Sequence, residues 1–240
     1  ADRMFDMGFQ PQIEQVLRYV PKERQTMLFS ATMPREIMAL ASRHMKLPIH
    51  IEIAPSGTIA ENLAQELFIV RHESKPQLLG KILAQYRGSV LLFSRTKHGA
   101  RKIAKVVRDQ GHTSAEIHSD RTLGQRTAAL EGFKVGRYRV LVATDIASRG
   151  IHVKGIELVI NYDLPDDAEN YVHRIGRTGR AGLEGRAISF ATPDQASAVQ
   201  SIEKIMRISI PVSQHPDVPA EEFYFASRAS NRSAGRNFSR

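Results

Sequence analysis

The sequence predicts an α/β fold in which helices cover both faces of a parallel sheet. Short apolar runs alternate with segments of helical periodicity along most of the 240 residues. Two of these runs, Val90–Phe93 and Val140–Ala143, are apolar at every position, as is typical of strands buried on both faces. Gly111 and Gly136 each follow a helical segment, where C-terminal caps are common. The repeated strand–helix–strand order predicts right-handed crossovers and a functional edge at the carboxyl ends of the strands.

The individual elements follow from the period of the apolar residues. Short apolar runs bounded by turn residues predict strands, and apolar residues three or four positions apart predict helices. The predicted strands are residues 25–30, 49–53, 66–70, 89–94, 114–118, 138–144, 157–162 and 185–191. The predicted helices include residues 75–86, 97–110, 123–135, 168–175 and 195–208.

The chain divides into four expected segments. Residues 1–53 hold two predicted strands, too few to close a doubly wound sheet, so we expect this segment either to dock onto something absent or to be the end of a larger domain. Residues 54–65 open with Ala-Pro-Ser-Gly-Thr and are predicted to be a linker. Residues 66–212 carry the remaining strands and form the main domain. Residues 213–240 are predicted to be a basic, disordered tail, because they end in Arg-rich polar sequence without acids.

Composition excludes several classes of protein. The chain is 42% hydrophobic and 25% charged, so it can bury a large core and is not disordered throughout. It has no cysteine, which excludes a disulfide scaffold, a Cys-based zinc site and thiol catalysis. No run approaches 18 apolar residues and no charged-then-apolar leader opens the chain, so neither a membrane span nor a secretion signal is expected. The net charge of 34 − 25 = +9 favours a polyanionic partner, most often nucleic acid, although solubility alone also explains such a charge.

The strongest motif is Tyr-Val-His-Arg-Ile-Gly-Arg-Thr-Gly-Arg at residues 171–180. It places four basic side chains in eight residues: His173, Arg174, Arg177 and Arg180. Closely spaced guanidinium groups repel one another, which favours an anion or acidic partners opposite them. The planar guanidinium fork suits phosphate oxygens. The alternative is a solvated basic loop, which the regular spacing at the end of a helix disfavours.

Two further strands end in polar residues. The apolar run at 140–143 leads into Thr144 and Asp145 and then into Arg-Gly at 149–150, which places a hydroxyl, a carboxylate and a guanidinium at the functional edge. The run that ends at Phe29 leads into Ser30-Ala-Thr32. Each pattern alone is also consistent with ordinary capping of the next helix.

Together these motifs resemble the DEAD-box RNA helicases of bacterial type, in helicase superfamily 2. Ser-Ala-Thr at 30–32 resembles the coupling motif of that family, and Leu-Leu-Phe-Ser-Arg-Thr at 91–96 resembles its motif IV. Thr144-Asp145 with Arg-Gly at 149–150 resembles motif V, and residues 173–180 resemble motif VI. The opening Ala-Asp resembles the second half of Asp-Glu-Ala-Asp itself. The resemblance runs from residue 1 to about residue 212, with the motifs in the family's order.

The resemblance implies a RecA-like parallel sheet covered by helices on both faces, preceded by an incomplete remnant of a first RecA-like lobe. It implies an ATP-dependent RNA helicase that remodels RNA duplexes, and partners that include RNA, bound through its backbone, and the missing amino-terminal lobe. ATP and Mg²⁺ would be held mainly by that lobe, because the chain contains no Gly-x-x-x-x-Gly-Lys-[Ser/Thr] loop. We therefore expect no ATP hydrolysis by this chain alone, and a cytoplasmic, monomeric protein without a membrane partner.

The resemblance also implies a role for individual residues. Arg177 and Arg180 would reach the γ-phosphate as arginine fingers, with His173 as the third residue of the catalytic set. Gly150 and His152 would lie on the nucleotide side, and His173 would couple the lobes. The other implied coupling residues are Asp2, Ser30 and Thr32. The implied RNA-binding residues are Arg95, Thr96, Arg126, Thr144 and Asp145, of which Asp145 would order the surrounding loop.

Three positions depart from the family pattern. Ser119 stands where the family usually has Gly, and Leu123 stands where it usually has Gln, so we expect one weaker contact to RNA. His152 stands where the family usually has an Asp that holds the ribose, so we expect weaker ATP binding than in relatives. Two other functions stay open: a stand-alone, non-catalytic RNA-binding module, and a DNA-directed relative in superfamily 2, which the Ser-Ala-Thr triplet disfavours.

Overall fold

The computed structural model describes residues 1–6, 8–30, 33, 35–51, 63–148, 153, 155–179 and 184–224. The chain divides into two compact units, Ala1–Thr58 and Ile59–Arg240. We describe each unit by itself.

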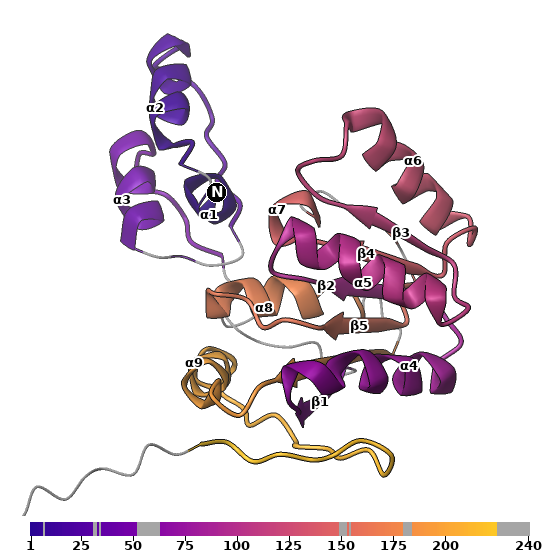
Figure 1. Cartoon of the computed structure of the whole chain (residues 1–240). Coiled ribbons are helices and arrows are strands. Elements are labelled where there is room, and N and C mark those ends of the chain that lie inside the picture. Colours follow the sequence, from indigo (N-terminus) through magenta and orange to yellow (C-terminus); the bar gives the residue numbers. More distant parts are fainter. Residues whose placement is uncertain are drawn as a thin grey trace, which may run out of the picture. The chain divides into compact units, whose positions relative to one another are not determined.

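The second unit is built on a six-stranded sheet in which every neighbouring pair is parallel (Figure 1). Its strands are β1 (Leu63–Ile69), β2 (Val90–Phe93), β3 (Ser114–Ile117), β4 (Val140–Ala143), β5 (Leu158–Asn161) and β6 (Gly185–Ala191). They lie in the order β1-β6-β5-β2-β4-β3, so β1 and β3 form the two edges. The α/β fold with a parallel sheet is confirmed.

Helices cover both faces of the sheet because successive strand residues point to opposite sides. In β2, Val90 and Leu92 pack toward one core and Leu91 and Phe93 toward the other. The first core is covered by α4 (Lys75–Gln85) and α5 (Lys97–Asp109), and the second by α6 (Leu123–Lys134), α8 (Ala168–Ile175) and α9 (Ala196–Met206). Two short helical turns, η1 (His72–Ser74) and α7 (Asp145–Ser148), complete the unit.

Local signals set the ends of these helices. Thr96 caps α5 by accepting a hydrogen bond from the Gly99 amide at 2.9 Å. Thr122 and Gln125 form a reciprocal capping box at the start of α6. Gly111 and Gly136 follow α5 and α6 with φ of +84° and +76°, the left-handed conformation that glycine adopts without strain. The prediction that these glycines end helices is confirmed.

The predicted elements of this unit match the structure closely. Residues 185–191 and 168–175 form β6 and α8 with the predicted bounds. Strand β1 starts at Leu63, three residues before the predicted start and inside the predicted linker. Directly after β4 the chain forms one helical turn, α7.

The segment 211–224 corrects the expectation that a disordered tail begins at residue 213. Its backbone follows the outer edge of β1: the Ser213 amide donates to Leu67 at 2.8 Å and the Glu221 amide to Ile69 at 3.1 Å. Val218 is buried in the core beside α4. The segment thus pairs an edge strand that would otherwise expose its backbone groups.

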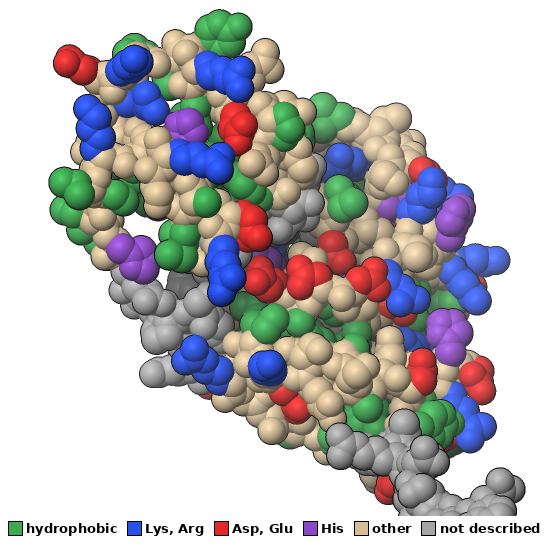
Figure 2. All heavy atoms as spheres, turned by 90° about the vertical axis from the view of Figure 1, so that its left-hand side faces the viewer, with side chains coloured by type: hydrophobic (Ala, Val, Ile, Leu, Met, Phe, Trp, Pro, Cys, Tyr) green, Lys and Arg blue, Asp and Glu red, His purple; other side chains and the backbone are tan. Residues whose placement is uncertain are grey.

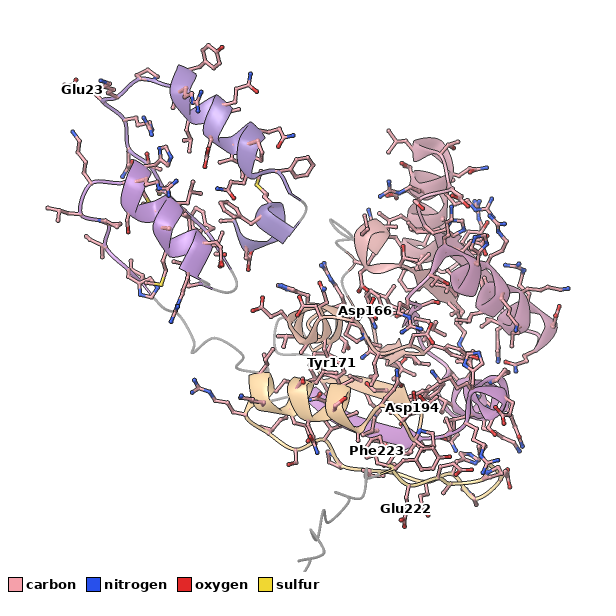
Figure 3. The ribbon with its side chains drawn as sticks, turned by 60° about the vertical axis from the view of Figure 1, so that its left-hand side comes forward. Glu23, Asp166, Tyr171, Asp194, Glu222 and Phe223 are labelled. Carbon is pink, nitrogen blue, oxygen red and sulfur yellow. The ribbon has the colours of Figure 1, made fainter. Side chains whose placement is uncertain are left out.

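Ion pairs and a final backbone bond hold the same segment. Lys81 of α4 pairs with Asp217 at 2.5 Å, and the Tyr224 amide donates to the Pro193 carbonyl at 2.8 Å. This last bond places Phe223 near Asp194, at the end of β6 (Figure 3). The remainder of the predicted tail, residues 225–240, lies outside the described residues.

The first unit contains α1 (Asp2–Asp6), α2 (Gln10–Tyr19) and α3 (Arg35–His44). Residues 25–30, predicted to form a strand, form none, and neither do the described residues 49–51 of the second predicted strand. A strand needs a hydrogen-bonded neighbour, and no strand of the described part of this unit supplies one. The prediction for residues 25–30 is therefore wrong, and that for residues 49–53 is wrong over 49–51; residues 52 and 53 lie outside the described residues.

Across the described residues, no helix combines the length and the apolar character needed to cross a membrane.

Candidate functional site

Four segments with polar residues meet at the carboxyl edge of the sheet. They are the turn after β2 with Arg95 and Thr96, the turn after β4 with Thr144 and Asp145, the loop after β5, and the end of α8. All four belong to the second unit. In open parallel sheets ligands bind at this edge, so its geometry decides what the unit can do.

The buried side chain of Arg174 in α8 links these segments through hydrogen bonds. Its guanidinium, 2% exposed, forms two parallel hydrogen bonds of 2.6 Å to the Asp145 carboxylate. It also donates to the Asn161 side chain at 3.1 Å and to the Asp163 carbonyl at 2.6 Å. The group lies 5.0 Å from the centre of the Phe93 ring. Arg174 is thus an internal residue whose donors face the protein, and Asp145 is the acidic partner that the sequence argument required.

This arrangement is consistent with the loop-ordering role predicted for Asp145. Its carboxylate is committed to Arg174, so it suits ordering of the loop after β4 and not direct contact with a phosphate. The side chain is 26% exposed, and Thr144 beside it is half-buried. Thr144 donates its backbone amide to the Ile117 carbonyl at 3.2 Å, which ties this turn to β3.

Asp163 links the loop after β5 to the turn after β2. Its carboxylate accepts from the Ser94 hydroxyl at 3.0 Å and from the Arg95 amide at 3.1 Å. The other oxygen lies 3.4 Å from the ammonium of Lys75, which also donates to the Tyr162 carbonyl at 2.7 Å. Asp163 therefore orients the backbone that carries Arg95.

Asp163 and Lys75 form a buried pair in which each charge shifts the pKa of the other group. Burial alone would raise the pKa of Asp163, but Lys75 and the donors from Arg95 and Ser94 outweigh it and hold the pKa below its ordinary value. Burial lowers the pKa of Lys75, with the Asp163 charge opposing the shift. Sequence reasoning missed both residues; the position of Asp163 directly after a buried strand at the carboxyl edge was the available signal.

The predicted RNA contacts lie around this network. Arg95 is about half exposed, and its guanidinium lies 3.6 Å from Asp166. Thr96 is exposed, and its oxygen already accepts from the Gly99 amide, which leaves its hydroxyl proton to donate elsewhere. Arg126 of α6 reaches the Ala147 carbonyl at 3.5 Å. The structure thus brings the turn with Arg95 and Thr96 and the start of α6 to one edge.

Tyr171 anchors α8 under the same site. Its ring is fully buried, and its hydroxyl lies 3.2 Å from the Gln65 side chain and 3.1 Å from the Ser189 hydroxyl. Burial raises its pKa to about 12. Figure 3 shows Tyr171 beneath the loop that carries Asp166. The helix that carries His173 and leads to Arg177 is therefore fixed against β1 and β6.

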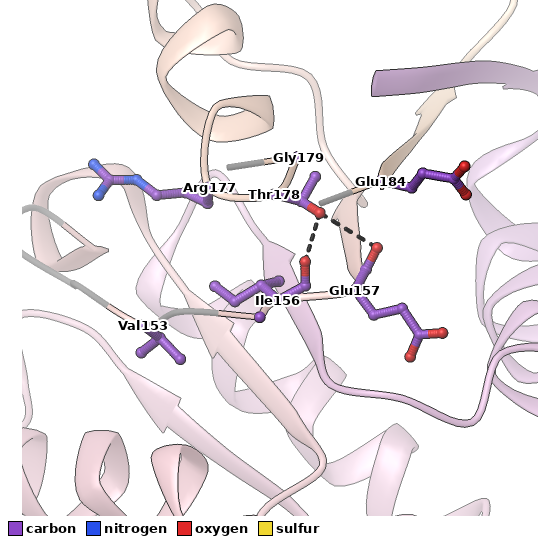
Figure 4. A pocket seen from close by; sticks show the side chains of 8 residues that line it. Val153, Ile156, Glu157, Arg177, Thr178, Gly179 and Glu184 are labelled. Atoms are coloured by element: carbon purple, nitrogen blue, oxygen red, sulfur yellow. Dashed lines mark hydrogen bonds between the residues drawn. The ribbon is translucent and has the colours of Figure 1, made fainter. Parts of the chain in front are cut away.

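A pocket of about 290 Å³ opens beside the end of α8. It is lined by Val153, Gly155, Ile156, Glu157, Arg177, Thr178, Gly179 and Glu184 (Figure 4). The Thr178 hydroxyl hydrogen-bonds to the Ile156 carbonyl at 2.5 Å and lies 3.3 Å from that of Glu157. Figure 4 shows the Arg177 guanidinium extending away from Thr178, at the margin of the pocket.

The backbone is tightly packed next to Arg177. Gly179 has φ of +66°, and a Cβ built on Gly185 would lie 2.2 Å from the Gly179 nitrogen. Two chain segments can approach this closely only without side chains. Arg180, Gly150 and His152, also predicted to act here, lie outside the described residues.

The first unit brings together two of the predicted coupling residues. The Asp2 amide donates to the Ser30 hydroxyl at 3.1 Å, and the amino group of Ala1 donates to the Phe29 carbonyl at 2.7 Å. Asp2 is buried. Thr32, the third predicted coupling residue of this unit, lies outside the described residues.

Each of the two units contains a match to a known protein family. Residues 74–182 match the helicase conserved C-terminal domain, and residues 1–40 match the DEAD/DEAH box helicase family. The chain belongs to the DEAD-box helicase family. The ATP-dependent RNA helicase DbpA of Bacillus subtilis is 41% identical over 223 residues, which are 92% of this chain and 46% of that protein. RhlB of Shewanella halifaxensis is 42% identical, over 90% of this chain and 50% of that protein.

Solved DEAD-box structures agree with the fold. A DEAD box protein of Methanococcus jannaschii is 37% identical, with a TM-score of 0.63 over 89% of this chain and 58% of that one. Dbp5 of Saccharomyces cerevisiae, bound to RNA and ADP BeF3, is 28% identical, with a TM-score of 0.76 over 86% of this chain and 55% of that one. The chain spans about half the length of the curated relatives it matches. The parallel sheet with its covering helices is thus the RecA-like sheet of a DEAD-box second lobe, and the recognition made from the sequence motifs is confirmed.

Proposed function

We propose that this chain is the carboxyl-terminal part of an ATP-dependent RNA helicase and contributes RNA contacts and arginine fingers to a site completed by a preceding lobe. The observation that carries the proposal is the internal network of Arg174, Asp145 and Asp163. It fixes, in one rigid arrangement, the turn with Arg95 and Thr96, the turn with Thr144 and the helix that leads to Arg177. RNA contacts and phosphate contacts would then move as one body.

The RNA side of the proposal rests on the exposed donors at the carboxyl edge. Arg95 and Thr96 present their side chains from the turn after β2, and Arg126 presents its side chain from α6. Contacts to phosphate and sugar give affinity without sequence information, so we expect little sequence preference. Dbp5, which was solved with RNA and ADP BeF3, supports RNA as the partner.

The nucleotide side fits a partial role for this chain. Among the described residues that line the pocket, Arg177 is the cation, and Glu157 and Glu184 bring two carboxylates. One guanidinium suits a single contact to a terminal phosphate, whereas a whole triphosphate needs more positive charge. In the described part of the chain, no three His, Asp or Glu side chains gather in a way that could hold a metal ion. ATP and Mg²⁺ would accordingly be bound by a preceding lobe, with His173, Arg177, Arg180, Gly150 and His152 completing the site.

When bound, ATP would supply the phosphoryl group that is transferred to water. The part of this chain would be to place Arg177 and Arg180 on the charge that develops there, an effect worth roughly three to five powers of ten in related reactions. His173 would sense closure against Asp2, Ser30 and Thr32. A cytoplasmic location, and a monomeric state of the protein with its preceding lobe in place, are part of the same proposal.

Two measurements on the purified chain test this. Phosphate release from Mg²⁺-ATP, with and without RNA, is expected to stay at background. Anisotropy of a labelled single-stranded RNA is expected to report weak binding that falls steeply with salt. Multiple-turnover hydrolysis by the pure chain would contradict the divided site, and absence of RNA binding at low salt would contradict the RNA contacts.

A longer protein that contains these residues separates the proposal from its alternative. If a phosphate-binding lobe precedes them, RNA should stimulate hydrolysis, and Arg177→Ala should abolish hydrolysis while RNA binding remains. If the native protein has the length of this chain, the stand-alone RNA-binding module is the correct function.

A further inference from the structure

Helix α5 carries a basic face that the site above does not use. Its sequence, Lys-His-Gly-Ala-Arg-Lys-Ile-Ala-Lys-Val-Val-Arg-Asp, contains five Lys and Arg residues and one acid. The apolar side is buried in the core and the basic side is exposed: Arg101, Lys102, Lys105 and Arg108. Helix α5 lies at the front in Figure 1 and therefore on the right in Figure 2, where Lys and Arg side chains gather. The middle of the face in Figure 2 carries carboxylates instead.

Part of this charge is balanced within the protein and part is not. Asp120 lies 2.8 Å from the Lys97 ammonium and 3.6 Å from the Arg101 guanidinium. Within the described part of the chain, the structure records no ion pair for Lys102 or Lys105. These two ammonium groups are three positions apart, so they are neighbours on the helix surface and repel each other. A polyanion along the helix would remove that cost.

The face begins where the proposed RNA contacts end. Thr96 is the N-cap of α5, and Arg95 precedes it, so the helix runs from the carboxyl edge outward along the covered face of the sheet. Lys97 and Arg108 are 11 positions apart, or about 16 Å along the axis at ~1.5 Å per residue. At roughly 3.4 Å per phosphate along one strand, this length matches about five phosphates.

The chemistry of the face favours nucleic acid over other partners. Lysine is depleted at protein–protein interfaces, whose centres are rich in aromatic residues. No large hydrophobic side chain of α5 is exposed, so the face has nothing to insert into another protein or into a lipid surface. Unpaired lysines in a row, without an apolar centre, suit a phosphate backbone.

We propose that the exposed face of α5, formed by Arg101, Lys102, Lys105 and Arg108, is a second RNA-binding surface that holds the RNA backbone beyond the carboxyl edge of the sheet. It rests on the proposed function, because it extends the RNA path that starts at Arg95 and Thr96. The surface binds RNA that is long enough to pass Thr96, and it leaves shorter RNA unaffected.

The test compares two RNA lengths. A labelled RNA of about six nucleotides covers roughly 20 Å, enough for the turns at the carboxyl edge, whereas one of about 18 nucleotides also reaches α5. The variant is Lys102→Ala/Lys105→Ala. Alanine has the highest helix propensity, so α5 should persist, and a thermal melt checks this. The matched control is Lys134→Ala/Lys204→Ala, which removes the same charge from exposed positions on α6 and α9.

The expected result is specific to length. For the long RNA, the slope of log affinity against log salt should fall by about 1.4, from two phosphate contacts at ~0.7 each. If the two curves converge at about 1 M salt, that slope makes binding at about 0.1 M salt roughly 25-fold weaker. Binding of the short RNA should not change, and the control should match the native chain on both RNAs.

Other results overturn the inference. If the double variant behaves as the control does with the long RNA, α5 is not an RNA surface, while the carboxyl edge stands through its binding of the short RNA. If variant and control weaken long-RNA binding equally, only net charge matters and the surface does not exist. Arg95→Ala should weaken both RNAs; failure of the native chain to bind either would remove the proposed function together with its extension.

Discussion

Arg174 and Asp145 are joined by two parallel hydrogen bonds of 2.6 Å, although 29 positions separate them in the sequence. The pair connects helix α8, which leads to Arg177, with the turn after β4. A shift of the carboxyl-terminal end of α8 must therefore also move the turn that carries Thr144. The coupling expected of a DEAD-box lobe would depend here on the hydrogen bonds of one buried arginine.

Arg174→Ala is expected to destabilise the second unit strongly. It removes one partner of a largely buried ion pair and leaves Asp145, Asn161 and the Asp163 carbonyl without their donor, a loss of roughly 3–5 kcal/mol in the free energy of unfolding. Urea denaturation followed by circular dichroism measures it. Arg101→Ala serves as the control, because its partner Asp120 forms an exposed pair worth less than about 1 kcal/mol. Equal effects of the two substitutions would contradict the internal role of Arg174.

Asp163→Asn is expected to cost stability in a pH-dependent way. The folded-state pKa of Asp163 is lowered, so the ionised carboxylate stabilises the fold at pH above its unfolded pKa of about 3.9, and this contribution disappears as pH falls through the folded pKa. At neutral pH the loss should be roughly 2 kcal/mol, since hydrogen bonds to a charged group are lost.

The difference between native chain and variant should shrink below about pH 4. Denaturation at neutral pH and in acid measures this difference directly. Asp166→Asn, at an exposed carboxylate, is the control and should change stability little at either pH. A constant difference across the range would show that Asp163 acts through shape and not through charge.

Leu123→Gln is expected to strengthen RNA binding. Leu123 is 77% exposed at the start of α6, one turn before Arg126, so the exchange leaves the core intact. The amide gains one hydrogen bond to the RNA backbone, and a net bond of about 0.5–1.5 kcal/mol corresponds to roughly two- to tenfold in affinity. Val135→Gln, at the exposed other end of α6, is the matched control and should leave affinity unchanged. Anisotropy titrations of both variants decide the matter.

Phe29→Ser is expected to reduce self-association of the chain. Phe29 is 78% exposed and Met27 is 69% exposed, in a segment with strand-like sequence and no strand neighbour among the described residues of its unit. Exposed apolar, unpaired segments associate with one another. Sedimentation velocity over a concentration series should show a smaller weight-average mass for the variant. Tyr224→Ser, at an exposed aromatic residue of the second unit, should not change it.

The sequence was sufficient for most elements of the second unit because their signals are local. The bounds of α8 and β6 follow from a capping Asp167 and from an apolar run, and both are independent of distant residues. Residues 25–30 had an equally clear strand pattern, yet a strand forms only when another strand pairs with it. Pattern alone does not show whether that neighbour belongs to the chain.

The inner arrangement of the site was beyond sequence reasoning for a related reason. In the motif at residues 171–180, the spacing of the basic residues does not distinguish Arg174 from Arg177. Only the fold shows that Arg174 faces Asp145. Lys75 lies 88 positions from Asp163, and nothing in its local sequence marks it as buried. The residues at the carboxyl edge could be predicted because the ends of strands are visible in the sequence. The groups that orient these residues could not, because their positions depend on tertiary contacts.

The anchoring of Thr178 has a consequence for how this loop tolerates change. Its hydroxyl is held by the carbonyl oxygens of Ile156 and Glu157, which every amino acid supplies. Substitutions of those two side chains would therefore leave the anchor in place, provided the backbone keeps its course. Side-chain changes at Glu157, just before β5, should therefore leave the loop that presents Arg177 in place. Mutational tolerance should be high at Glu157 and low at Thr178, Gly179 and Gly185.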